Sequence, residues 1–213
     1  MYEPRLEHHF EDLPKQRHAA RLGVWIFLAS ELLFFAGLFT LYAYYRTQHP
    51  DVFAEGVQHN SRLLGTLNTL VLIGGSLAAA LAVNYLRFDD WRKGRLFCGL
   101  AALSALVFLV VKGIEYGQHF AEGIHPGGVG HFFVENPEPG YGVFFTLYFA
   151  MTGLHGIHVI IGAGMLLAAT VWIHRRRTNR EGAYKVELVA LYWHFVDTIW
   201  IFLWPMFYLM GQA

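Results

Sequence analysis

Five long apolar stretches, separated by short charged segments, are the feature of this 213-residue sequence that most restricts its fold. A bilayer core of about 30 Å is crossed by roughly 20 residues of α-helix, and transmembrane strands would instead alternate over about ten residues. We therefore predict an all-α, polytopic transmembrane bundle of five helices. The predicted spans lie at about residues 22–45, 63–86, 96–117, 142–173 and 186–210.

The N-terminal segment differs in composition from the rest of the chain. Charged residues make up 15% of the sequence, against about a quarter in an ordinary soluble domain, and several of them precede the first apolar stretch. A secretory signal peptide would be short, basic and then apolar, so we expect the first span to be an uncleaved anchor. We divide the chain into a cytoplasmic N-terminal segment, residues 1–21, and a transmembrane domain, residues 22–210.

The distribution of Lys and Arg between the spans predicts the orientation. Thirteen of these residues lie on one side of the predicted membrane and two on the other, with Lys112 inside a span. The positive-inside rule then places the N-terminus in the cytoplasm and the C-terminus in the periplasm. The thirteen are Arg5, Lys15, Arg17, Arg21, Arg87, Arg92, Lys93, Arg95, Arg175, Arg176, Arg177, Arg180 and Lys185, and the two are Arg46 and Arg62.

Glu31 is a carboxyl group in the middle of the first predicted span. It follows Arg21 by ten residues, and a helix rises 1.5 Å per residue. Its neighbours on the same helix face are apolar and include no basic residue, so the neutral, protonated form is favoured. An ionisable group at this depth is a candidate functional site, here for taking up protons. A protonated carboxyl that only hydrogen-bonds a neighbouring helix or lipid is an equally weighted alternative.

Two pairs of polar residues at i, i+3 spacing lie at middle depth in the last two spans. His155 and His158 form one pair, and His194 and Asp197 form the other. Such residues could be haem ligands, a metal site or a proton relay. We favour a buried polar layer that holds the helices in register through interhelical hydrogen bonds.

Other candidate residues have more modest interpretations. Lys112 and Glu115, also at i, i+3, are expected to pair toward the outer end of the third span. His119, His125 and His131 fall in the predicted outer loop, residues 118–141, where solvated histidines are commoner than metal ligands. The single cysteine, Cys98, excludes an internal disulfide and a cysteine-based metal cluster. We predict no metal site and no catalytic residue within this chain.

Several segments together resemble subunit III of cytochrome c oxidase, in the haem–copper oxidase superfamily. GVWIFLASELLFF is similar to the family helix that carries a membrane-embedded glutamate, which corresponds to Glu31. KGIEYGQHF contains the glutamate that corresponds to Glu115. LHGIHVIIG and YWHFVDTIWIFLW resemble the last two family helices, and NTLVLIGG the start of an earlier one. The segments follow family order over residues 23–209.

The resemblance implies a non-catalytic core subunit of an aerobic terminal oxidase in the bacterial inner membrane. It implies no cofactor on this chain, with haem and copper held by the catalytic subunit I, and subunit II as a further partner. It also implies bound phospholipid in a cleft near Glu31 and a supporting role in proton uptake and oxygen access. Electrons would reach the complex from cytochrome c, and no nucleic acid is involved.

The chain departs from the many family members that have seven helices, because the first two are missing here. A longer catalytic subunit is the expected source of that pair. Glu31 and NTLVLIGG resemble the cytochrome c branch of the family more than the quinol branch, so cytochrome c is the expected electron donor and quinol the alternative. Membership of a respiratory supercomplex stays open. Two rival functions are a haem-binding cytochrome using His155, His158 and His194, and a proton-coupled transporter using Glu31 and Asp197.

Overall fold

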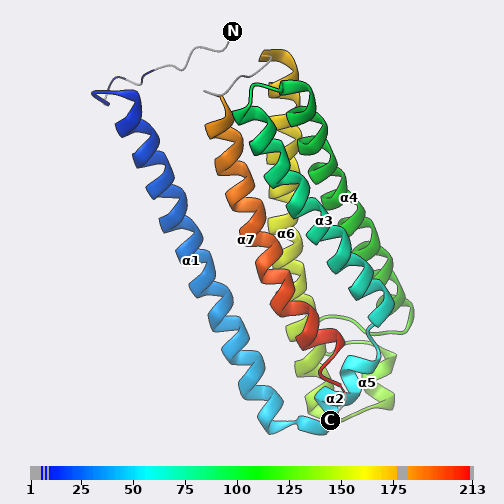
Figure 1. Ribbon diagram of the computed structural model, residues 1–213. Coiled ribbons are helices and arrows are strands. Elements are labelled where there is room, and N and C mark those ends of the chain that lie inside the picture. The colour runs from blue at the N-terminus through cyan, green and yellow to red at the C-terminus, as the bar shows by residue number, and fades with distance from the viewer. Residues whose placement is uncertain (1–5, 7, 9, 177–181, 212–213) are drawn as a thin grey trace.

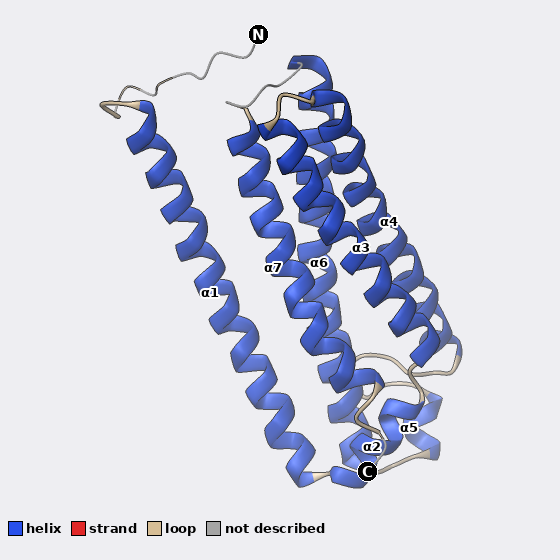
Figure 2. Ribbon diagram, in the orientation of Figure 1, coloured by secondary structure: helices blue, strands red, loops and turns tan. Residues whose placement is uncertain are grey.

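The computed structural model describes residues 6, 8, 10–176 and 182–211, and these form helices and loops without a β-sheet (Figure 2). Arg5, Arg177 and Arg180 of the charge count lie outside these ranges. The helices are α1 (Leu13–Gln48), α2 (Pro50–Gln58), α3 (Arg62–Arg87), α4 (Trp91–Ala121), α5 (His131–Glu135), α6 (Pro139–Arg176) and α7 (Ala183–Tyr208). Five of them, α1, α3, α4, α6 and α7, are long and apolar enough to cross a membrane, as the sequence predicts.

The helices mostly extend beyond the predicted spans because polar residues cap their ends. α1 begins at Leu13, where the backbone N–H of Lys15 donates to Asp12 Oδ1 at 2.7 Å. At α4, the backbone N–H of Lys93 donates to the Asp90 carboxylate, and this bond lowers the pKa of Asp90. α7 is the exception, since it ends at Tyr208, two residues before the predicted limit.

The short helix α2 was not predicted. It spans nine residues, too few for a clear apolar pattern in a loop that also contains polar residues. Its apolar face is buried, with Phe53 in edge contact with Phe144 of α6. α2 therefore closes one end of the bundle, opposite the start of α1, rather than forming an extended loop (Figure 1).

α3, α4, α6 and α7 form a packed bundle, and α1 leans away from it (Figure 1). Only 11% of an 18-residue apolar stretch of α1 is buried, compared with 50% of the corresponding stretch of α7. The buried residues of α1 are Leu28, Phe35 and Tyr42, which follow one another at seven-residue intervals. α1 thus touches the bundle along one narrow line.

Small residues bring α3 and α4 close together. A Cβ atom at Gly75 would lie 1.9 Å from Oγ and 2.8 Å from Cβ of Ser104. Ala78, Ala79 and Ala82 of α3 are also buried. Without a hydrophobic driving force between helices in lipid, this close approach is what lets van der Waals contact hold them together.

Candidate functional site

Glu31 of α1 faces His158 of α6 across the narrow contact between these helices. Glu31 Oε2 lies 3.0 Å from His158 Nε2, and the side chains are 23% and 15% exposed. The sequence showed no basic neighbour on the Glu31 face of α1, and the partner instead comes from another helix. Tyr192 of α7 completes the surroundings by donating its hydroxyl to the backbone oxygen of His158 at 3.1 Å.

The second nitrogen of His158 limits the protonation states of this pair. Nδ1 lies 2.8 Å from the backbone oxygen of Leu154, which can only accept, so Nδ1 carries a proton. Nε2 then either accepts a hydrogen bond from a neutral Glu31 carboxyl or, when it is protonated, donates one to the Glu31 carboxylate. In both arrangements one proton lies between the two side chains and their total charge is zero.

His155 has different surroundings from His158 although they are three residues apart. Its side chain is fully buried, stacked on Trp200 with ring centroids 5.3 Å apart and in edge contact with Phe108 at 5.5 Å. Neither ring nitrogen has a hydrogen-bond partner in the part of the chain that the structure describes. His155 points into the bundle between α4 and α7, whereas His158 points toward α1.

His194 and Asp197 do not pair with each other either. His194 Nδ1 lies 2.6 Å from Ser76 Oγ on α3, which is an interhelical hydrogen bond of the predicted kind. Asp197 is 5% exposed, and Ser76 lies close to its carboxyl. Neither Asp197 oxygen reaches hydrogen-bonding geometry with a described residue. His194 and Asp197 thus share Ser76 as a neighbour, whereas His155 and His158 have separate surroundings, and the four residues do not form one connected hydrogen-bond network.

Lys112 and Glu115 pair as predicted, inside a cluster that the sequence did not reveal. Lys112 Nζ lies 3.4 Å from Glu115 Oε2 and donates to the hydroxyl groups of Tyr148 and Tyr208, both at 2.9 Å. Both hydroxyl groups donate in turn to Glu115 Oε1 at 2.6 Å. The Lys112 ammonium also lies 5.0 Å from the ring centroid of Tyr116. This cluster ties α4 to α6 and α7.

The loop histidines are only partly where the sequence placed them. His119 belongs to the last turn of α4 and is 2% exposed, against the rings of Phe145, Tyr148 and Phe149. The helix continues to Ala121, and the chain turns at Gly123 with φ 73°. His125 lies in the following loop and His131 begins α5. Among the described residues, no three His, Cys, Asp or Glu side chains are arranged to hold a metal ion.

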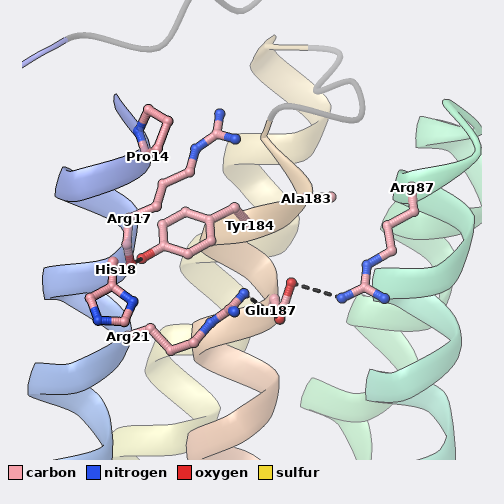
Figure 3. Close-up of a pocket in the computed structure, with 8 residues that line it drawn as sticks. All are labelled: Pro14, Arg17, His18, Arg21, Arg87, Ala183, Tyr184 and Glu187. Carbon is pink, nitrogen blue, oxygen red and sulfur yellow. Dashed lines mark hydrogen bonds and ion pairs between the residues drawn. The ribbon is translucent and has the colours of Figure 1, made fainter. Parts of the chain in front are cut away.

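One cluster was missed by the sequence interpretation. Arg17 and Arg21 of α1, Arg87 of α3 and Glu187 of α7 meet at one end of the bundle (Figure 3). The basic residues entered the prediction only as charges that set orientation. Their separation in sequence gave no sign that Glu187 would lie between them.

The family model for cytochrome c oxidase subunit III matches residues 14–212. The chain belongs to this family. Among relatives, a cytochrome c oxidase subunit 3 of Thermostichus vulcanus is 33% identical over 90% of this chain and 87% of its own length. A probable quinol oxidase subunit 3 of Staphylococcus haemolyticus is 28% identical over 91% and 90%. Members of this family are subunits of multi-subunit oxidases, so the polar groups above belong to one part of a larger membrane complex.

Proposed function

We propose that this chain is the non-catalytic core subunit III of an aerobic haem–copper oxidase of the cytochrome c type in a bacterial inner membrane. The observation that carries the proposal is the family match over residues 14–212, together with five helices able to span a membrane. Subunit I, holding haem and copper, and subunit II are the proposed partners. The redox chemistry and proton pumping belong to that complex, and this chain stabilises subunit I.

The proposed orientation has the N-terminus in the cytoplasm and the C-terminus in the periplasm. The start of α1, the α3–α4 connection and the start of α7 lie at the same end of the bundle (Figure 1). Most of the described basic residues of the larger set lie on or next to these segments, and Arg175 and Arg176 lie in the last turn of α6 at the same end (Figure 1). Arg46 and Arg62 are at the opposite ends of α1 and α3. This gathering of charge supports the orientation through the positive-inside rule.

Phospholipid binding and support of proton uptake are proposed for the groove beside Glu31. This groove has a volume of about 420 Å³, and apolar residues of α1, α6 and α7 line it along with Glu31 and His158. An acyl chain fits such a lining. The single proton held between Glu31 and His158 can move from one side chain to the other without creating net charge, which lowers the cost of holding it in an apolar setting.

A structural role is proposed for His155, His158, His194 and Asp197. His158 and His194 each make a polar contact to another helix, and His155 packs between the rings of Trp200 and Phe108. The two histidines of α6 point to different neighbours, which argues against a shared haem or metal site. Interhelical contacts of this kind favour one register of α6 and α7 against α1 and α3.

The electron donor is proposed to be cytochrome c, with quinol as the alternative because relatives of both kinds match this chain to a similar extent. Purification of the native complex through a tag on this chain tests the function. We expect subunits I and II and their haem to copurify, with cytochrome c oxidation exceeding quinol oxidation. Stoichiometric haem on the isolated chain, or a complex without subunit I, would overturn the proposal.

A further inference from the structure

A pocket of about 850 Å³ opens where α1 and α7 begin and α3 ends (Figure 3). It lies at the membrane boundary, because the apolar run of α1 begins directly after Arg21 and Arg87 is the last residue of α3. The three arginines come from α1 and α3, and α7 supplies an acidic and an aromatic side chain. The lining residues are Pro14, Arg17, His18, Arg21, Arg87, Ala183, Tyr184 and Glu187.

The pocket has more positive than negative charge. Glu187 accepts from Arg21 Nη2 at 3.1 Å and from Arg87 Nη2 at 2.8 Å, so one carboxylate bridges α1 and α3 (Figure 3). Arg17 takes part in none of the ion pairs among the described residues, and its guanidinium lies 5.8 Å from the Tyr184 ring centroid. Three guanidinium groups therefore face one carboxylate, which leaves capacity for a further anion.

An apolar groove continues from this pocket toward the middle of the membrane. It has a volume of about 490 Å³ and shares Arg21 and Glu187 with the charged pocket. Trp25 of α1, Ala80 and Val83 of α3 and residues of α7 as far as His194 line it. The groove beside Glu31 is lined by α6 where this one is lined by α3, and the two grooves share one lining residue, Leu188 of α7.

We propose that this pocket binds the phosphate of an anionic membrane lipid, with an acyl chain in the groove between α1, α3 and α7. Guanidinium groups match phosphate geometry and form two parallel hydrogen bonds with it. A charged pocket that leads into an apolar groove matches the two parts of a lipid, whereas a soluble anion would use only the first. This inference extends the lipid binding of the proposed function to a second site.

Glu187 gives the proposed site a distinctive electrostatic property. Its carboxylate competes with the lipid phosphate for Arg21 and Arg87, the same two groups that it now bridges. A bound phosphate links α1 to α3 in the same way, so the lipid reinforces the position of the loosely packed α1. Removal of the carboxylate should then strengthen lipid binding, an effect opposite to that expected if Glu187 were part of the lipid site.

The test measures lipid binding to the purified full chain by native mass spectrometry, with phosphatidylglycerol, phosphatidylcholine and inorganic phosphate as probes. Phosphatidylglycerol is expected to bind about tenfold more tightly than phosphatidylcholine. Arg17→Gln, which leaves the Glu187 bridge intact, should weaken phosphatidylglycerol binding by about tenfold. Arg92→Gln is the matched control, since Arg92 is exposed at the same end of the bundle and outside the pocket.

Glu187→Gln is the second variant, and it should bind phosphatidylglycerol more tightly than the unmodified chain. Equal losses in Arg17→Gln and Arg92→Gln would show attraction to diffuse charge and overturn the proposal. Displacement of the lipid by an equal concentration of inorganic phosphate would assign the pocket to a soluble anion and also overturn it. Copurification of Arg17→Gln with the haem-containing subunits tests the proposed function separately, because lipid loss there leaves haem content unchanged.

Discussion

The Glu31 carboxyl and the His158 ring join α1 to α6 at 3.0 Å, in a part of the molecule where α1 is otherwise weakly attached. Because His158 Nδ1 donates to the backbone oxygen of Leu154, the pair holds one proton between its two side chains and carries no net charge. Glu31 is thus half of an interhelical pair and not an isolated carboxyl.

Glu31→Gln is expected to leave assembly of the oxidase complex intact. The glutamine amide has a similar shape and can donate to His158 Nε2, so the contact between α1 and α6 survives without a charge. Subunit stoichiometry of the purified complex is the measurement. His158→Phe is the comparison variant, in which Glu31 loses its partner and this subunit should be retained less well. Loss of the subunit from the Glu31→Gln complex would mean that Glu31 acts as a charged structural partner.

Lys112→Met should destabilise the chain by about 3–5 kcal/mol, because it leaves Glu115 without its buried counter-charge. The double variant Lys112→Met/Glu115→Gln should recover much of this loss, since a neutral amide can still accept from Tyr148 and Tyr208. Denaturant unfolding of the full chain in detergent gives both values. Lys93→Met on the same helix is the control, because its ion pair with Asp90 is exposed to solvent and contributes little to stability. A double variant as unstable as the single one would contradict the ion-pair account.

Gly75→Ala should destabilise the contact between α3 and α4 by about 1–3 kcal/mol, because the new methyl group overlaps Ser104. Ser104 cannot turn aside freely, since its hydroxyl donates to the backbone oxygen of Ala101 at 2.7 Å. The adjacent Gly74→Ala is a matched control, as nothing lies within 4 Å of a Cβ atom there. Thermal unfolding in detergent should separate the two variants, and equal melting temperatures would refute the packing argument.

The C-terminus should face the periplasm. Fusion of a reporter that is active only outside the cytoplasm, such as alkaline phosphatase, to the end of the chain should give high activity. The same reporter placed in the α3–α4 connection, between Arg87 and Trp91, should be inactive because that connection is predicted to lie in the cytoplasm. The reverse pattern of activities would show that the charge distribution does not set the orientation.

Much of the local structure could be predicted because it depends on residues close together in the chain. Hydropathy located all five spans, and i, i+3 spacing predicted the contact of Lys112 with Glu115 within one helix. The same spacing did not give His155 and His158 common neighbours. Side chains three residues apart differ in direction by about 60° around a helix, which is enough for one to enter the bundle and the other to face α1.

The sequence by itself determined five membrane-spanning helices, a family and a set of polar residues in or beside the spans, because bilayer thickness and the cost of unsatisfied polar groups act on each segment separately. Only the tertiary structure decided which of those residues meet. Glu31 and His158 are 127 positions apart, and Arg21 and Glu187 are 166 apart. Their contacts follow from the relative tilt and rotation of whole helices, which depend on packing between surfaces such as Gly75 and Ser104 and not on the pattern along any one span.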